Sequence, residues 1–179
     1  MIPVFGPSDV LPPFVGADAT VRAQCSPYVT TCTEIVRRFG TSSERLIILR
    51  GLLDYRAELA GIGIVRGFQW IDGSFVEDCE TIRQRPPGDV DVVTFAYRPV
   101  TQNWPEVVQQ HPQIFDSSRT KALFRCHAYY VDLQIPPHLI VHDTTYFNSL
   151  FSHQRDSKLW KGMLAVDLNS DDSAARQIL

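Results

Sequence analysis

The stretch from Gly67 to Phe95 constrains the fold most, because it combines two strand patterns with a sharp turn between them. Its first half, GFQWID, is rich in aromatic and β-branched residues and ends at a glycine. Its second half, GDVDVVTF, alternates aspartate with valine and then becomes fully apolar. This pattern predicts a strand, a Gly-Ser turn, a short polar segment and a second strand.

The turn itself has the chemistry of a phosphate-binding loop. Gly73 lets the backbone turn tightly and brings amides close to a phosphate, and the hydroxyl of Ser74 adds a further donor. We therefore expect Gly73 and Ser74 to hold phosphate groups.

Two carboxylates, Asp89 and Asp91, open the second strand. Residues i and i+2 of a strand point to the same side, so these side chains project together with Cα atoms roughly 6.6–7 Å apart. Mg²⁺ prefers carboxylate, water and phosphate oxygens, usually with one or two protein carboxylates per ion. Two ions about 3.5–4 Å apart can hold the attacking and leaving oxygens of a displacement at phosphorus. The pair thus predicts a site for Mg²⁺ or Mn²⁺.

The order Gly-Ser, polar interval, Asp-apolar-Asp resembles the signature of the polymerase-beta-like nucleotidyltransferases, with Gly73, Ser74, Asp89 and Asp91 at its motif positions. The resemblance implies an NTP substrate and Mg²⁺ held by Asp89 and Asp91. It also implies a third carboxylate on a later strand facing the first two. Asp132, in the run AYYVDLQI, is the candidate. It would complete one metal site and help to deprotonate an attacking hydroxyl.

Most of the chain, including FQWIDGSFVE and the late FSHQRD and WKGM, is also similar to a family of small uncharacterised bacterial nucleotidyltransferase-like proteins. That likeness brings no substrate with it.

Four basic residues near these motifs are candidates for triphosphate binding: Arg83, Arg85, Lys121 and Arg125. The planar fork of arginine suits phosphate, and a cationic cluster facing the cleft could also hold a nucleic-acid acceptor. The alternative is a solvated surface. A later cationic stretch, HQRDSKLWK from His153 to Lys161, either stacks on and neutralises a nucleotide or packs as a tail helix, and the sequence slightly favours the helix.

The rest of the chain predicts one domain of α/β (α+β) class, a mixed sheet of four to six strands with packed helices. Its 179 residues, 44% of them hydrophobic, can bury one core. Residues 1–18, with four prolines, predict an extended arm before the domain at 19–179. Apolar spacing predicts helices from Ser26 to Phe39 and, after a cap at 41–44, up to Gly61, with Arg45 on the solvated side.

Charge and hydropathy exclude other classes. The net charge of −3 gives no global attraction for nucleic acid. No apolar run approaches the ~20 residues of a membrane span, and no signal-peptide pattern opens the chain, so we expect a cytoplasmic protein without a membrane partner. The four cysteines show no zinc spacing, and we expect them to be reduced.

These features favour a Mg²⁺-dependent transfer of an NMP group from NTP to a hydroxyl of RNA, protein or a small molecule, in a setting that includes toxin or defence roles. The alternative is a catalytically silent module that binds nucleotide or nucleic acid. The chain leaves little room for an acceptor-binding domain. A homo-oligomer or a cognate partner protein would supply that surface if the chain does not.

Overall fold

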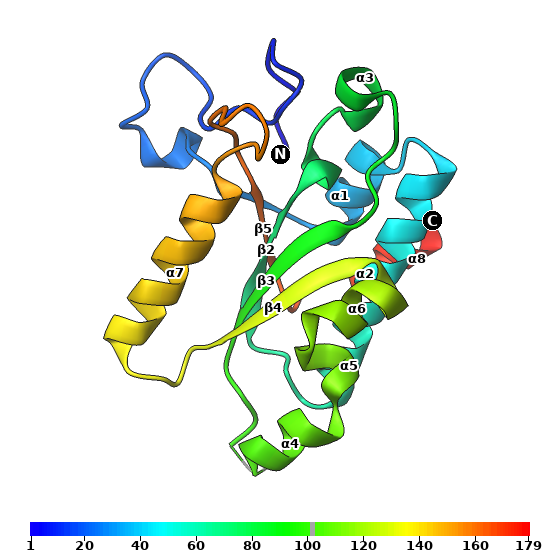
Figure 1. The fold of residues 1–179 in the computed structure, drawn as a ribbon, viewed down its shortest axis with the longest axis vertical. Helices are drawn as coiled ribbons and strands as arrows, with labels where there is room; N and C mark the ends of the chain where they lie inside the picture. The colour runs from blue at the N-terminus through cyan, green and yellow to red at the C-terminus, as the bar shows by residue number, and fades with distance from the viewer. Residues whose placement is uncertain (101–102) are drawn as a thin grey trace.

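The computed structural model describes residues 1–100 and 103–179 and confirms the α/β (α+β) class. A five-stranded mixed sheet of order β1-β5-β2-β3-β4 forms its centre (Figure 1). The strands are β1 (Tyr28–Thr30), β2 (Gly67–Asp72), β3 (Val90–Ala96), β4 (Cys126–Asp132) and β5 (Leu164–Asp167).

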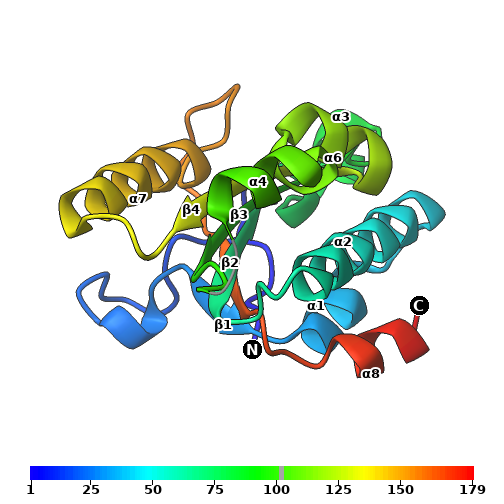
Figure 2. The same ribbon diagram turned by 90° about the horizontal axis from the view of Figure 1, so that it is seen from below.

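The helices cover the two faces of this sheet unequally. They are α1 (Cys32–Phe39), α2 (Ser43–Gly61), α3 (Cys79–Arg83), α4 (Trp104–Gln110), α5 (Pro112–Phe115), α6 (Ser117–Phe124), α7 (Pro137–Phe151) and α8 (Asp172–Gln177), with short 3-10 turns η1 (Arg22–Gln24) and η2 (Ser74–Val76). Figure 2 shows α7 on one side of the sheet and α1, α2 and α8 on the other. None of the helices in the described residues is both long and apolar enough to cross a membrane.

The strand register fixes which side chains meet. β2 and β3 are antiparallel, with Asp72 opposite Asp91, whereas β3 and β4 are parallel, with Asp91 opposite His127. Directly opposite residues in a sheet project to the same face. The carboxyl end of β2 and the amino ends of β3 and β4 therefore lie together at one end of the strands, which we call the edge of the cleft, and polar residues are grouped there.

Alternation along the strands divides the core into two apolar clusters. Ile71 and Val92 face α1 and α2 in the larger cluster, and Trp70 and Val93 belong to a smaller cluster on the opposite face with Phe147 of α7. This inside-outside alternation is the period of two that a strand imposes. It leaves the α7 face with less apolar cover and room for a cleft.

Several local predictions are confirmed by the structure. Helix α2 begins after Ser42, whose side chain accepts a hydrogen bond from the amide of Arg45, and it ends at Gly61. Residues 1–18, all of which are described, contain no helix or extended strand. They are tied down nonetheless, because Leu11 is buried and its carbonyl accepts from the amide of Gly162. All four cysteines are free.

Two helix predictions are wrong. The chain from Tyr28 to Thr30 is a strand paired with β5, and α1 begins only after Thr31, whose side chain caps it. Tyr28 and Thr30 are buried and Val29 is exposed, which is the alternation of a strand. The stretch 152–161 is not a tail helix but a loop, bridged at its base between His153 and Trp160. We call it the 152–161 loop.

Candidate active site

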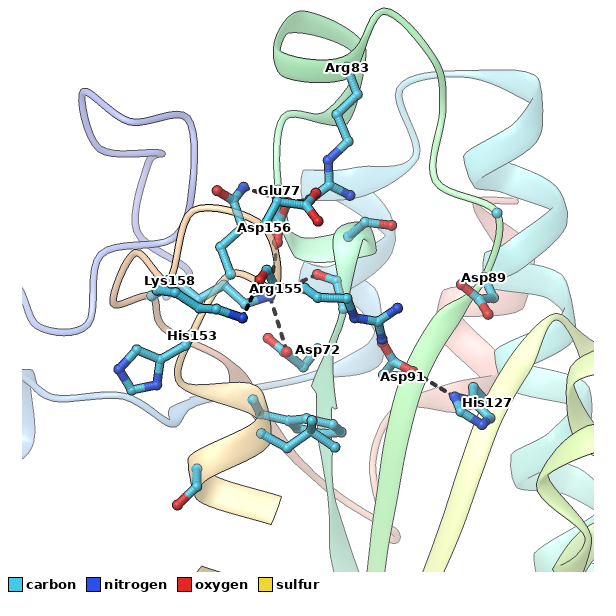
Figure 3. A pocket seen from close by; sticks show the side chains of 18 of the residues that line it. Asp72, Glu77, Arg83, Asp89, Asp91, His127, His153, Arg155, Asp156 and Lys158 are labelled. Carbon is cyan, nitrogen blue, oxygen red and sulfur yellow. Dashed lines mark hydrogen bonds and ion pairs between the residues drawn. The ribbon is translucent and has the colours of Figure 1, made fainter. Parts of the chain in front are cut away.

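A charged cleft of about 890 Å³ opens at the edge where β2 ends and β3 and β4 begin, on the side of α7 (Figure 3). Most residues predicted from the sequence line it: Gly73, Ser74, Arg83, Arg85, Asp89, Asp91 and Lys121. The 152–161 loop and the last turns of α7 form the opposite wall. The fold thus gathers residues from four separate segments of the chain.

The Gly-Ser turn and the acidic strand form one unit. Gly73 has a φ of +81°, which favours glycine, and a Cβ atom at this position would overlap Oδ2 of Asp91. The contact follows from the register, because Asp72 pairs with Asp91 and places the turn directly beside that carboxylate. Only glycine leaves space here for the Asp91 side chain.

Asp89 and Asp91 both reach the cleft, with side chains 20% and 23% exposed. Oδ2 of Asp89 lies 2.7 Å from Nζ of Lys121. Burial raises the pKa of Asp91, and the negative charge of Asp89 raises it further. Two like charges held side by side favour the binding of a cation between them.

A hydrogen-bonded chain leads from Asp91 to β4. Nδ1 of His127 lies 3.1 Å from Oδ1 of Asp91, and Nε2 lies 3.0 Å from Oη of Tyr129. An ionised Asp91 carboxylate only accepts, so Nδ1 of His127 donates to it, and in the tautomer with hydrogen on Nδ1 alone Nε2 is an acceptor for the hydroxyl of Tyr129. The residue of β4 that lies opposite Asp91 is thus His127, where a third carboxylate was expected.

Asp132 does not join this group, and the three aspartates do not converge. It pairs with Ala96, five residues along β4 from His127, which is roughly 16 Å at about 3.3 Å per residue. An odd separation also turns its side chain to the other face of the sheet. Its carboxylate lies 3.4 Å from Nε of Arg98 instead. The sequence run around Asp132 marked the right strand but not the register.

Arg125 also lies outside the cleft. It caps the carboxyl end of α6 in a left-handed conformation, with a φ of +55°, and is exposed. Lys121, one helical turn earlier, reaches Asp89. The expected basic cluster is thus divided between the cleft and the solvent.

A buried ionic network supports the turn from below. Nζ of Lys161, 3% exposed, lies 3.1 Å from each of three oxygens: Oδ2 of Asp72, Oε1 of Glu77 and the carbonyl of Gly73. Oε2 of Glu77 accepts from Arg83 and from Gln154, each at 3.0 Å. Buried charges persist only when they are paired and hydrogen-bonded, and here two acids are matched by two bases.

The pKa shifts in this network reflect burial and pairing. Burial raises the pKa of Asp72 to about 7, and the charge of Lys161 opposes that rise. Burial lowers the pKa of Lys161, but the carboxylates of Asp72 and Glu77 outweigh it and raise the pKa overall. Oδ1 of Asp72 is buried without a hydrogen-bond partner. This oxygen is therefore an acceptor without a donor, close to Asp91.

Arg45 holds the other side of the turn, and its solvated position was wrongly predicted. It is 3% exposed and donates to the carbonyls of Phe75 and Glu77, each at 2.7 Å, and to Glu80. A signal for this was present, because Arg45 precedes the buried Ile48 and Leu49 by three and four residues and so shares their helix face. No comparable local signal marked Lys161, whose partners are distant in sequence.

The donor set fits a metal ion that the substrate helps to hold. Among the described residues, no group of three or more His, Cys, Asp or Glu side chains is arranged to bind a metal ion. Mg²⁺ commonly takes one or two carboxylates and completes its shell with water and substrate phosphates. Asp89 and Asp91 offer those two carboxylates, and the absent Cβ of Gly73 keeps Oδ2 of Asp91 uncrowded.

Fold and site together define an α+β protein with a mixed five-stranded sheet and an acidic pair, flanked by cations, at the edge of its central strands. The chain belongs to a family of unknown function, DUF6932, which matches residues 3–167. No curated protein and no solved structure matches it. The matched residues include every element that lines the cleft.

Proposed function

We propose that this cleft transfers a nucleoside monophosphate from an NTP to a hydroxyl group, with Mg²⁺ or Mn²⁺ bound at Asp89 and Asp91. One observation carries the proposal. The Gly-Ser turn and the acidic strand, separate in sequence, meet where the missing Cβ of Gly73 makes room for Asp91. A phosphate grip and a metal clamp in contact are what displacement at phosphorus needs.

Each residue has a role in this reaction. The backbone of Gly73 and the hydroxyl of Ser74 bind phosphate oxygens, and Asp89 and Asp91 hold the ion. When bound, the ion neutralises the charge that builds on the phosphate oxygens. His127 takes the role expected of Asp132, because it stands beside Asp91 and its Nε2, which contacts the hydroxyl of Tyr129, can accept a proton from a hydroxyl in that place. An acceptor hydroxyl would replace that of Tyr129, give its proton to Nε2 of His127 and attack the α-phosphorus, so that the bond between the α- and β-phosphates breaks and pyrophosphate leaves.

The acceptor is a hydroxyl of RNA, protein or a small molecule, and a toxin or defence setting is compatible with each. The experiment that tests the function is transfer of radiolabel from each of four α-³²P-labelled NTPs, with Mg²⁺ or Mn²⁺, to total RNA, protein and small metabolites. Label should appear with the wild-type chain and not with Asp89→Ala/Asp91→Ala. Label that is independent of both aspartates, or none while nucleotide fails to bind, contradicts the proposal.

The second candidate is a catalytically silent module that binds nucleotide. The observation that favours it is the histidine in place of a third carboxylate, together with a metal donor set limited to two acids. Label transfer by the wild-type chain distinguishes the two candidates. A silent module transfers no label and binds NTP equally well in the wild type and in Asp91→Asn. The enzyme transfers label as the wild type and loses transfer in the variant.

A further inference from the structure

The cations around the cleft fall into two groups. Arg83 and Lys161 are committed to the buried network, and Lys121 is paired with Asp89. Among the described residues, Arg85, Arg155 and Lys158 also line the cleft, yet none of the three has a carboxylate within ion-pair distance. All three are exposed. Two of these three available cations come from the 152–161 loop.

The 152–161 loop is a tied structure and not a loose tail. At its base, the amide of Gln154 donates to the carbonyl of Leu159 and the amide of Lys161 to that of Ser152, each at 2.8 Å. The side chain of Gln154 is bonded to Glu77, and Lys161 is bonded to the carbonyl of Gly73. The loop is thus fastened directly to the Gly-Ser turn.

The two free cations of this loop, Arg155 and Lys158, lie at its tip on the cleft side. Figure 3 shows the side chain of Arg155 extending across the cleft toward the side of Asp91. The charge of Arg155 also acts on Tyr129 of β4. Burial raises the pKa of Tyr129, and the positive charges of Lys121 and Arg155 oppose that rise. Nζ of Lys158 donates to the carbonyl of Arg155 at 2.7 Å, which holds the two residues together.

The backbone at Lys158 has a φ of +59°, a conformation that side-chain-bearing residues rarely adopt. Such a conformation persists when the surrounding contacts impose it, and it clusters at ligand-binding sites. Here it lets the chain turn back toward Trp160 while Lys158 stays on the cleft side. A glycine would be the ordinary choice if the turn had no other task.

We propose that the 152–161 loop is the polyphosphate clamp of the cleft, with Arg155 and Lys158 binding the outer phosphates of the nucleotide. This inference rests on the proposed function. Asp72, Asp89 and Asp91 alone would repel a triphosphate, so cations that are not already neutralised must face them. Arg83, predicted as a phosphate ligand, instead supports the clamp from behind, through Glu77 and through Asp156 at 3.7 Å.

The proposal predicts different effects of the loop cations on the affinities for nucleoside tri- and monophosphates. A charge-assisted hydrogen bond contributes about 1.5–3 kcal/mol, or at least about tenfold in affinity for each side chain. If Arg155 and Lys158 grip the outer phosphates, their loss weakens binding of NTP about 100-fold. Binding of NMP, which lacks those phosphates, changes less than about threefold by the same reasoning.

The experiment is calorimetric titration of the tightest of ATP, GTP, CTP and UTP, and of its di- and monophosphate, at fixed Mg²⁺ and ionic strength. The variant is Arg155→Ala/Lys158→Ala. The matched control is Arg119→Ala/Arg176→Ala, which removes the same charge from residues paired with Asp116 and Asp54 away from the cleft. Thermal midpoints verify that both variants fold.

Loss of NTP affinity in the loop variant, graded by phosphate number and absent from the control, is the expected result. An unchanged affinity, an equal loss for NMP, or the same loss in the control overturns the clamp while wild-type NTP binding leaves the proposed function standing. Failure of the wild-type chain to bind any of the four NTPs overturns both.

Discussion

The two faces of the central strands show opposite uses of the same backbone. Toward α1 and α2, β2 and β3 present residues such as Ile71 and Val92, both 0% exposed, packed in the larger apolar cluster. Toward α7, the same strands present aromatic residues and then, at one edge, Asp72 and Asp91. The difference lies in alternate positions of two short strands.

This difference separates stability from chemistry. The α1 and α2 face buries apolar surface, which contributes about 25 cal/mol per Å², and its apolar side chains do not line the cleft. The α7 face carries buried and half-buried charges that cost free energy unless they are paired. The first face should therefore tolerate no loss of volume, and the second no loss of charge or space.

The largest expected effect is on the α7 face. Asp91→Asn removes one of the two proposed metal ligands and should lower kcat/KM for nucleotidyl transfer about 1,000-fold, which corresponds to a rise of about 4 kcal/mol in the activation free energy. Because the folded-state pKa of Asp91 is raised, its ionised form destabilises the fold near neutral pH, and the asparagine variant should unfold at an equal or higher denaturant concentration. A large drop in stability would show that Asp91 is structural.

The next effect belongs to the opposite face. Ile71→Ala opens a cavity beside α2, and the loss of the buried side chain should lower the free energy of unfolding by about 2–5 kcal/mol. Its neighbours in sequence, Trp70 and Asp72, keep their positions on the other side. Denaturant titration gives the stability, and kcat measured per folded molecule should stay within about twofold of wild type because Ile71 does not reach the cleft. A selective loss of kcat would break the separation of the two faces.

Gly73→Ala tests the contact that joins turn and acidic strand. The new Cβ overlaps Oδ2 of Asp91 at a φ of +81°, so the carboxylate must shift, and a displaced catalytic group costs on the order of 100-fold in rate. The matched control is Gly61→Ala at the end of α2, where an added Cβ meets nothing within 4 Å. The control should keep full activity. Equal activities of the two variants would contradict the proposed contact.

The smallest effect is expected at Asp132. Asp132→Asn leaves the cleft intact and should change kcat less than about twofold, whereas His127→Ala removes the proposed proton acceptor and should lower kcat about 100-fold or more. Steady-state transfer by both variants ranks the two residues. The reverse order would restore Asp132 as the third member of the site.

The sequence predicted the local part of this site and missed the long-range part. Asp91 lies in β3 and Asp89 directly before it, so the predicted period of two brought both to the cleft although only Asp91 is in the strand, and Gly73 follows from the conformation that only glycine adopts readily. The pairing of His127 with Asp91 depends on the register between β3 and β4, which neighbouring residues do not specify. Asp132 was misplaced for that reason.

The errors in secondary structure have a similar cause. A strand as short as Tyr28–Thr30 shows too few alternations to compete with the helical spacing that continues into α1, and its pairing with β5 decides the outcome. The 152–161 loop has the composition of a polar helix, but Lys161 and Gln154 are held by Glu77 and Gly73, far away in sequence. Tertiary contacts override local propensity at both places.

The most direct test of the proposed site is a crystal structure of the chain with Mn²⁺ and a non-hydrolysable NTP analogue, with the ion located by anomalous scattering. The account predicts an anomalous peak bound by Asp89 and Asp91, phosphates against Gly73 and Ser74, and Arg155 turned toward the outer phosphates. A nucleotide bound elsewhere, or an ion that does not contact either aspartate, would contradict it.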